Sequence, residues 1–261
     1  MPIYLGSSNV TITKVFKEKD MTGEIIQRTI SGSYKNNQIT NIRSCAFLSC
    51  TALTSVNFPA CTSIGSSAFY YCDNLTSVSF PACTHIWYAA FENCSRLTTA
   101  NFPSCTSVYD NAFLSCSALT SVNFPVCTII NDYAFAYCSS LTEVSFPACT
   151  KISMYAFRSC YNLTSVSVPA CTSIGYAAFN GCSALSYIDL SNIQTIGANA
   201  FAECTNLYSI NLGYVQSVPT LSSYAFYSTA LGNIYVPGSL YSAFIVAPEW
   251  SQYSSIINYA N

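Results

Sequence analysis

The amino-acid sequence predicts a mainly β repeat solenoid, in which short coils stack along one axis. The first observation is a period of 22 residues, at which an Ala-Phe pair returns through most of the chain. The second is that cysteine, proline, leucine and other aliphatic residues stand at fixed distances from that pair. Strict self-similarity at a period of about 20 to 50 residues is typical of solenoids, whose units bury their apolar faces only against their neighbours.

The repeat can be followed in columns of like residues. The phenylalanine column comprises Phe47, Phe69, Phe91, Phe113, Phe135, Phe157, Phe179 and Phe201. One cysteine column comprises Cys50, Cys72, Cys94, Cys116, Cys138, Cys160, Cys182 and Cys204. The second cysteine column comprises Cys61, Cys83, Cys105, Cys127, Cys149 and Cys171. Cys45 belongs to neither column.

Each repeat reads as two short extended pieces and a corner. The segment "LTSVNF" (53–58) alternates apolar and polar residues, which predicts a strand with one buried face. Pro59 ends this strand because proline cannot donate to a ladder. The following "TSI" (62–64) predicts a second, shorter extended piece. "SSAFYYC" (66–72) predicts a single 3₁₀ or helical turn, since seven residues are too few for a stable helix.

The repeat divides the chain into three regions: an N-terminal cap or docking segment (1–38), the solenoid (39–237, about nine coils) and a C-terminal helical cap (238–261). The first region matches the repeat poorly, and "EIIQRTIS" (24–31) predicts a capping strand. The last region has helical spacing, which Pro248 is expected to break or kink.

"LTSVNFPACTSIGSSAFYYC" (53–72) resembles the BspA-type, or Treponema pallidum-type, leucine-rich repeat. The resemblance covers residues 39 to about 237 in phase, apart from a phenylalanine at the strand end and the second cysteine. It implies a right-handed leucine-rich-repeat coil with a parallel sheet on the concave face and short 3₁₀ or helical turns on the other side. It also implies a bacterial surface or secreted protein tied to adhesion and protein binding.

Composition argues against several classes of partner. Charged residues make up 8% of the chain, against roughly 25% in ordinary globular proteins. The net charge of -2 provides no field that would attract nucleic acid. No apolar run approaches the roughly 20 residues of a membrane-spanning helix. The N-terminus does not resemble a signal peptide, so the expected localisation stays open between the cell surface and a virion.

The sequence offers no basis for catalysis, a metal or a cofactor. Both cysteine columns fall at apolar phases, which favours buried thiols over disulfides or a zinc site. His85, the single histidine, lies in a variable column, and no pair of carboxylates recurs. We therefore predict that the chain is not an enzyme.

Two surfaces are candidates for binding. Tyrosine with Ser, Gly and Asn is the mixture of antibody-like surfaces, because Tyr offers rigid amphipathic area. The aromatic candidates are Tyr70, Tyr71, Trp87, Tyr88, Tyr109, Tyr133, Tyr137, Tyr155, Tyr161 and Tyr176. The polar candidates on the predicted strand face are Thr54, Ser55, Asn57, Thr76, Ser77, Ser79, Thr98, Thr99 and Asn101. The alternatives are that the tyrosines simply keep a charge-poor coil in solution, and that the strands form a plain solvated sheet.

Two functions from different classes follow. The first is a non-catalytic binding or adhesion module that presents the solenoid to a protein or glycan partner. The second is a structural or receptor-binding component of a prophage tail or another assembly, docked through residues 1–38. A third reading, an ice-binding surface on the threonine ladder, is disfavoured because the neighbouring column mixes Ser, Thr and Glu143.

Overall fold

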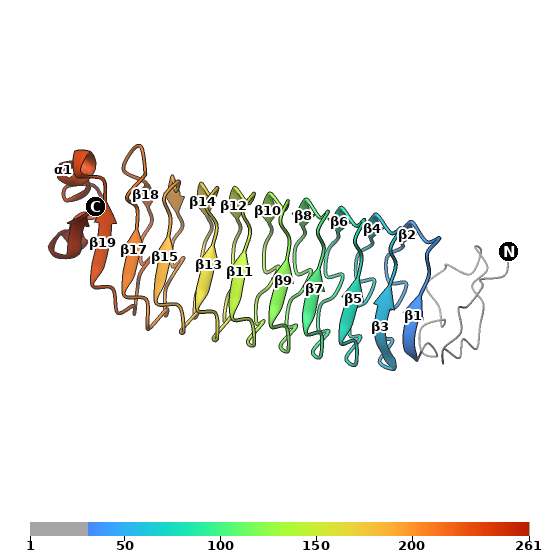
Figure 1. Cartoon of the computed structure of the whole chain (residues 1–261). Helices are drawn as coiled ribbons and strands as arrows, with labels where there is room; N and C mark the ends of the chain where they lie inside the picture. Colours follow the sequence, from blue (N-terminus) through green and yellow to red (C-terminus); the bar gives the residue numbers. More distant parts are fainter. Residues whose placement is uncertain (1–30, 261) are drawn as a thin grey trace.

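The computed structural model describes residues 31–260, and these form one continuous solenoid (Figure 1). Successive coils stack from the N-terminal to the C-terminal end, as the repeat predicts. The predicted capping strand at 24–31 lies outside the described residues except for Ser31.

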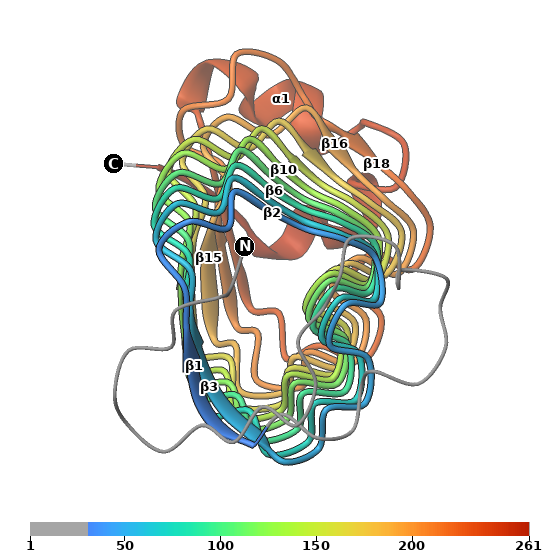
Figure 2. The ribbon, with the colours of Figure 1, turned by 90° about the vertical axis from the view of Figure 1, so that its right-hand side faces the viewer.

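Each coil has three sides, which the view along the axis separates (Figure 2). The first side is formed by the longer strands, which we call the strand face. These strands are β1 (Gly32–Lys35), β3 (Leu53–Asn57), β5 (Ser77–Ser79), β7 (Thr99–Asn101), β9 (Ser121–Asn123), β11 (Glu143–Ser145), β13 (Ser165–Ser167), β15 (Tyr187–Asp189), β17 (Ser209–Asn211) and β19 (Asn233–Val236). They pair in parallel within three segments, β1 to β9, β11 with β13, and β15 to β19. The sheet therefore begins at β1, within the predicted N-terminal segment.

The second side is one parallel sheet of two-residue strands, at the place where the sequence predicts a second extended piece. These strands are β2 (Asn41–Ile42), β4 (Ser63–Ile64), β6 (His85–Ile86), β8 (Ser107–Val108), β10 (Ile129–Ile130), β12 (Lys151–Ile152), β14 (Ser173–Ile174), β16 (Thr195–Ile196) and β18 (Thr220–Leu221). Partners stand in register 22 residues apart in most pairs, for example Ile64 with Ile86.

The third side, which we call the turn face, differs from the predicted 3₁₀ turn. Bonds of 3₁₀ type do occur, such as Cys50 N–H to the carbonyl of Phe47 at 3.1 Å. However, Cys45 and Ser49 adopt the left-handed conformation, with φ of 59° and 56°. Their N–H groups, and that of Phe47, donate to carbonyls of the next coil at 2.7–2.9 Å. The corner is therefore a third inter-coil ladder, in which every second N–H bonds across and the others bond locally.

The core between the three sides consists of the repeated columns. Phe69, Leu75, Cys72 and Ile64 are fully buried, and so are their equivalents in the following coils. Phenylalanine rings stack along the axis, as Phe113 does on Phe91 and on Phe135, each at 5.2 Å between ring centroids. One apolar core thus runs the length of the solenoid.

The C-terminal end is closed by a compact cap with less helix than the sequence predicts. It contains η2 (Gly238–Leu240), α1 (Tyr241–Phe244) and η3 (Ser251–Ile256). The last strand, β20 (Ile257–Tyr259), pairs in parallel with β19, where the sequence predicts a continuing helix. Trp250 is fully buried, and its indole N–H donates to the carbonyl of Pro219 at 2.7 Å. The buried Trp250 side chain and the added strand β20 together cover the open edge of the last coil.

The cysteines are buried free thiols, with Cys45 as the exposed exception. In the first column the thiols from Cys72 to Cys204 each donate to the carbonyl of a phenylalanine in the preceding coil, for example Cys116 Sγ to the Phe91 carbonyl at 3.1 Å. In the second column each thiol donates to the carbonyl two residues on, as Cys105 does to Ser107 at 3.2 Å. The sequence predicts that the thiols act as small buried hydrophobic side chains. The structure adds that the thiols just described also donate weak hydrogen bonds to backbone carbonyls.

We expect one thiol of the folded chain to react with a disulfide reagent at about pH 8, because the thiolate is the nucleophile and burial suppresses it. Burial raises the pKa of the Cys83 and Cys127 thiols to about 12, whereas Cys45 is exposed. Titration in denaturant without reductant should then return all fifteen thiols. Several fast-reacting thiols in the folded chain would contradict the buried columns.

Candidate binding surfaces

The first aromatic cluster is built around Trp87, at the junction between the short-strand side and the turn face. Its indole ring stacks on Tyr109 of the next coil, with centroids 4.4 Å apart and planes 24° from parallel. The imidazole of His85 stacks on the other side at 5.9 Å. Two polar contacts fix the rings: Trp87 Nε1 donates to Ser63 Oγ at 3.0 Å, and Thr84 Oγ1 lies 2.9 Å from His85 Nδ1. Trp87 is nevertheless 40% exposed.

The second cluster combines tyrosines with one cation. Tyr133 stacks on Tyr155 at 4.6 Å, and Tyr155 meets Tyr176 edge to face at 5.1 Å. The guanidinium carbon of Arg158 lies 5.2 Å from the centroid of Tyr155 and 5.9 Å from that of Tyr137. Both distances fall within the range of cation–π attraction. The cluster therefore holds an arginine against aromatic rings at the surface.

In this second cluster one phenol has a raised pKa beside a cation. Burial and the hydrogen bond with Tyr176 raise the pKa of Tyr155. Arg158 Nε is buried and has no hydrogen-bond partner among the described residues. An unpaired buried donor costs free energy.

A third, smaller cluster lies toward the N-terminal end. Tyr70 and Tyr71 meet edge to face at 4.5 Å. Burial raises the pKa of the Glu92 carboxyl, while a hydrogen bond from Asn111 opposes the rise. Burial and the nearby Glu92 raise the pKa of Tyr70. Asn111 also lies 3.5 Å from the hydroxyl of Tyr88, which links this cluster to the next coil.

The structure brings together the predicted aromatic residues that stand in adjacent coils. Trp87 with Tyr109 and Tyr133 with Tyr155 share columns one period apart, and both pairs stack. Tyr137 belongs to the second cluster through Arg158. Tyr161 lies apart, 51% exposed and without a ring contact among the described residues.

The predicted polar residues of the strand face use much of their hydrogen-bonding capacity internally. The hydroxyl of Thr76 donates to the carbonyl of Thr54 at 2.9 Å, and that of Thr98 donates to the carbonyl of Thr76 at 3.0 Å. Ser55 Oγ donates to Ser33 Oγ at 2.7 Å. Asn101 accepts a bond from Asn123 at 2.8 Å. These threonine hydroxyls bond back to the preceding coil, so they contribute no donor to a partner.

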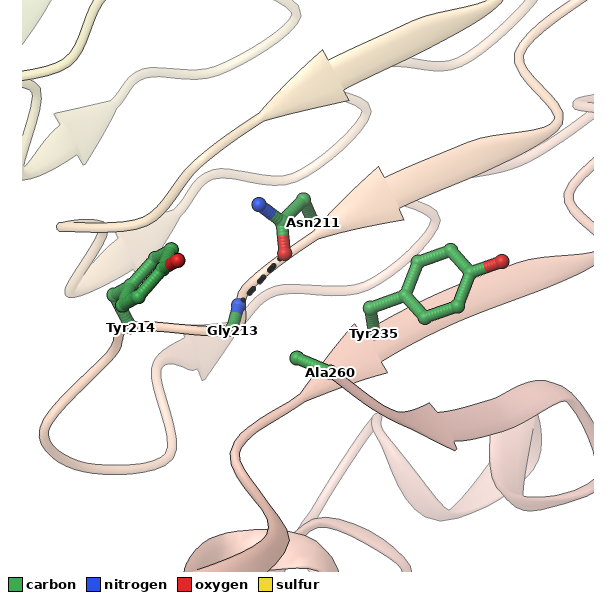
Figure 3. A pocket seen from close by; sticks show the side chains of 5 residues that line it. All are labelled: Asn211, Gly213, Tyr214, Tyr235 and Ala260. Atoms are coloured by element: carbon green, nitrogen blue, oxygen red, sulfur yellow. Dashed lines mark hydrogen bonds between the residues drawn. The ribbon is translucent and has the colours of Figure 1, made fainter.

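The C-terminal end of the strand face contains a pocket of about 310 Å³ that the sequence does not indicate. It is lined by Asn211, Gly213, Tyr214, Tyr235 and Ala260. Tyr214 and Tyr235 stand on opposite sides, with Asn211 and Gly213 between them (Figure 3). Asn211 Oδ1 accepts a hydrogen bond from the Gly213 N–H at 2.9 Å.

A carboxylate of the neighbouring coil extends this polar arrangement. Asp189 Oδ2 accepts from Asn211 Nδ2 at 3.1 Å, and Asp189 Oδ1 accepts from the Ser191 N–H at 3.0 Å and also from the Ser191 hydroxyl. Tyr187, 47% exposed, stands in the same strand, and burial followed by the charge of Asp189 raises its pKa. The result is a fixed network of acceptors beside exposed tyrosines.

Sequence reasoning missed three features of these surfaces. His85 stacks in the first cluster, and its position two residues before Trp87 on an extended segment could have indicated a shared face. Arg158 stands in a column whose members in the neighbouring coils carry no positive charge, and this difference could have indicated the cluster. Gly213-Tyr214 stands where six earlier coils have proline followed by Ala, Ser or Val, and the coil directly before it has Ser191-Asn192.

Within residues 31–260, no group of three His, Cys, Asp or Glu side chains is placed to hold a metal ion. No helix of this part of the chain is long and apolar enough to cross a bilayer. The surfaces therefore offer stacking and hydrogen bonding as their chemistry.

Stacked parallel coils with a leucine at or two residues before the start of each strand from β3 to β19, and short turns opposite, define a leucine-rich-repeat solenoid. Residues 29–141 and 128–244 match the family described as BspA type leucine rich repeat region. The chain belongs to this family, as the repeat predicts. Membership agrees with a binding or surface module and with a class of proteins that are typically not enzymes.

Several solved structures match the chain over most of its length. A leucine rich cell surface protein from Faecalibacterium prausnitzii is 25% identical over 89% of this chain and 80% of its own, with a TM-score of 0.42. A leucine-rich repeat protein from Bacteroides ovatus is 20% identical over 86% and 76%, with a TM-score of 0.43. The T. pallidum leucine rich repeat protein is 20% identical over 73% and 72%, with a TM-score of 0.40. No curated protein matches the chain.

Proposed function

We propose that the chain is a non-catalytic binding or adhesion module that engages a protein or glycan partner through its turn face. One observation carries this proposal: five successive coils each place an aromatic ring on the turn face or at its junction with the short-strand side. These rings, which we call the aromatic stripe, belong to Trp87, Tyr109, Tyr133, Tyr155 and Tyr176.

The stripe has the physical features of a recognition surface. Its rings are held by stacking, and Trp87 also by its bond to Ser63, so little side-chain entropy remains to be lost on binding. Trp, Tyr and Arg are the residues that most often dominate binding energy. The stripe contains the first two, and Arg158 stands beside it. With coils about 4.8 Å apart, the stripe extends roughly 19 Å along the axis, enough for a peptide or short oligosaccharide.

The proposal predicts that Trp87→Ala and Tyr155→Ala each weaken binding at least about tenfold, because truncating an aromatic anchor costs roughly 2 kcal/mol. The purified chain is applied to arrays of surface proteins and glycans, and affinity for each hit is measured by biolayer interferometry. The matched control is Tyr161→Ala, which removes an exposed tyrosine outside the stripe. Blank arrays, or equal binding by all variants, would defeat the proposal.

The alternative role as an assembly component depends on docking through residues 1–38. Most of that segment lies outside the described residues. No feature of residues 31–260 favours an assembly role over the binding role.

A further inference from the structure

We propose that the pocket at the C-terminal end of the strand face is a second binding site, which takes one ring of a neutral saccharide. The pocket belongs to the described part of the chain and shares no residue with the aromatic stripe. It can therefore succeed or fail independently of the turn face.

A local departure from the repeat opens the pocket. Earlier coils place proline directly after the apolar residue that ends the strand segment, as in Phe102-Pro103 and Phe124-Pro125. At the equivalent position Leu212 is followed by Gly213. A Cβ atom on Gly213 would lie 2.7 Å from Ala260 Cβ and 3.0 Å from Asn211 Oδ1. A larger residue would therefore displace the lining atoms, and glycine keeps the space.

The same departure from the repeat places an aromatic residue at one side of the pocket. Tyr214 stands where earlier coils have small residues such as Ala60 or Ala82. Its side chain is 69% exposed and has no ring contact among the described residues, so it adds nothing to the core or the cap. Tyr235 stands across the pocket (Figure 3). Two aromatic rings flanking a gap are suited to the C–H-bearing faces of a pyranose ring.

The polar side of the pocket can form hydrogen bonds with hydroxyl groups of a ligand. Asn211 has one amide hydrogen and one lone pair left after its bonds to Asp189 and Gly213. Asp189 lies in the neighbouring coil, outside the residues that line the pocket, and its Oδ2 accepts from Asn211 and so orients the amide. The amide of Asn211 can then act as donor and acceptor toward neighbouring hydroxyls of a sugar. The negative charge of Asp189 disfavours an anionic ligand, which is why the site suits a neutral sugar.

The arrangement is fixed before any ligand binds. Asp189 is held by the Ser191 N–H and hydroxyl as well as by Asn211, and Asn211 is held by the backbone of Gly213. Preorganised groups lose little entropy on binding, which favours recognition even in a small pocket. A volume of about 310 Å³ lies at the lower end of ligand pockets and fits a single sugar ring.

The chain contains a matched control for this site. Asn123 occupies the same column as Asn211 and bonds to Asn101 at 2.8 Å, much as Asn211 bonds to Asp189. At Asn123, however, Pro125 takes the place of Gly213 and Val126 that of Tyr214. Asn123→Ala therefore removes a strand-face amide without touching the pocket.

The test is a titration of the isotope-labelled chain with methyl glycosides of glucose, galactose, mannose, fucose and N-acetylglucosamine, followed by amide NMR shifts. We expect at least one glycoside to shift the Gly213 amide, with a Kd on the order of 1 mM for a single ring. Asn211→Ala and Tyr214→Ala should each weaken that binding about tenfold, whereas Asn123→Ala should leave it unchanged. Thermal melts confirm that each variant is folded.

Three results would overturn the proposal. The first is that no glycoside in the panel shifts Gly213. The second is equal binding by the wild type, Asn211→Ala and Tyr214→Ala. The third is binding of methyl glucuronide as tightly as methyl glucoside, which would contradict the role of Asp189. Loss of array binding by the stripe variants bears on the turn face alone.

Discussion

Raising the pH from about 8 to about 10 is expected to unfold the solenoid, because its core is lined by thiols that the folded state keeps protonated. Burial raises the pKa of Cys50, Cys83, Cys105 and Cys160 to about 12, and that of Cys149 to about 11. In the unfolded chain these thiols ionise near 8.5 to 9. Between these values the unfolded state releases protons and the folded state does not, so stability is full below about 8.5 and falls as the pH rises.

The expected loss of stability is large enough to unfold the chain. Each such thiol loses between about 1 and 2 kcal/mol of stabilisation at pH 10, and about ten of them together lose on the order of 10 to 20 kcal/mol. Whole domains are stable by roughly 5 to 15 kcal/mol. Circular dichroism across an alkaline titration should show a cooperative transition. Replacing the second cysteine column by alanine should raise the midpoint pH, and an unchanged spectrum up to about pH 11 would contradict the linkage.

Most of the fold could be predicted because each coil repeats the same pattern of buried and exposed residues. Phe69, Leu75, Cys72 and Ile64 are each confirmed as core by equivalents in every neighbouring coil. Stacking of Trp87 on Tyr109 was also predictable, since a shared column in adjacent coils places two side chains together on one ladder.

The turn conformation could not be predicted from residue types. Ser, Tyr, Asn and Ala all adopt positive φ at the corners, for example Ser67 at 53° and Tyr133 at 56°. Ser, Tyr and Ala give no local signal of the left-handed region, which glycine and asparagine usually mark. The conformation is set by the third ladder, because an alternating pattern directs N–H groups such as that of Ser67 to the next coil. This is a tertiary effect that overrides local preference.

The pocket was missed for a different reason. Its residues come from three separate segments, β17 with the loop that follows it, β19, and the chain end at Ala260. The repeat predicts contacts between equivalent positions, whereas Ala260 reaches Gly213 only because β20 adds to the sheet beside β19. The sequence predicts helix around 257–259 and therefore does not indicate this contact. Departures from a repeat thus mark candidate sites but do not show which segments meet there.

Phe113→Ala is expected to lower the free energy of unfolding by about 3 to 5 kcal/mol, as for a buried aromatic side chain whose removal leaves a cavity. Phe113 is fully buried, stacks on Phe91 and Phe135 at 5.2 Å, and meets Phe102 and Phe124 edge to face at 5.9 Å. Urea unfolding followed by circular dichroism measures the change. The inter-coil backbone hydrogen bonds on the sides of the solenoid hold the coils at a fixed spacing. The coils therefore cannot move together to fill the cavity.

Phe179→Ala is the matched control, since Phe179 is equally buried in the same column but contacts only Phe157 and Phe201 as aromatic partners among the described residues. Val168 and Leu190 stand where Phe113 has edge-to-face rings. Aromatic pairs contribute about 0.5 to 1.5 kcal/mol beyond buried area, so Phe113→Ala should cost about 1 to 3 kcal/mol more than Phe179→Ala. Equal losses at both positions would mean that the double row of rings stabilises the solenoid only through the area it buries. A larger loss at Phe113 would instead locate the greatest coupling between coils where the two phenylalanine columns run side by side, and the array would then unfold first toward its C-terminal half.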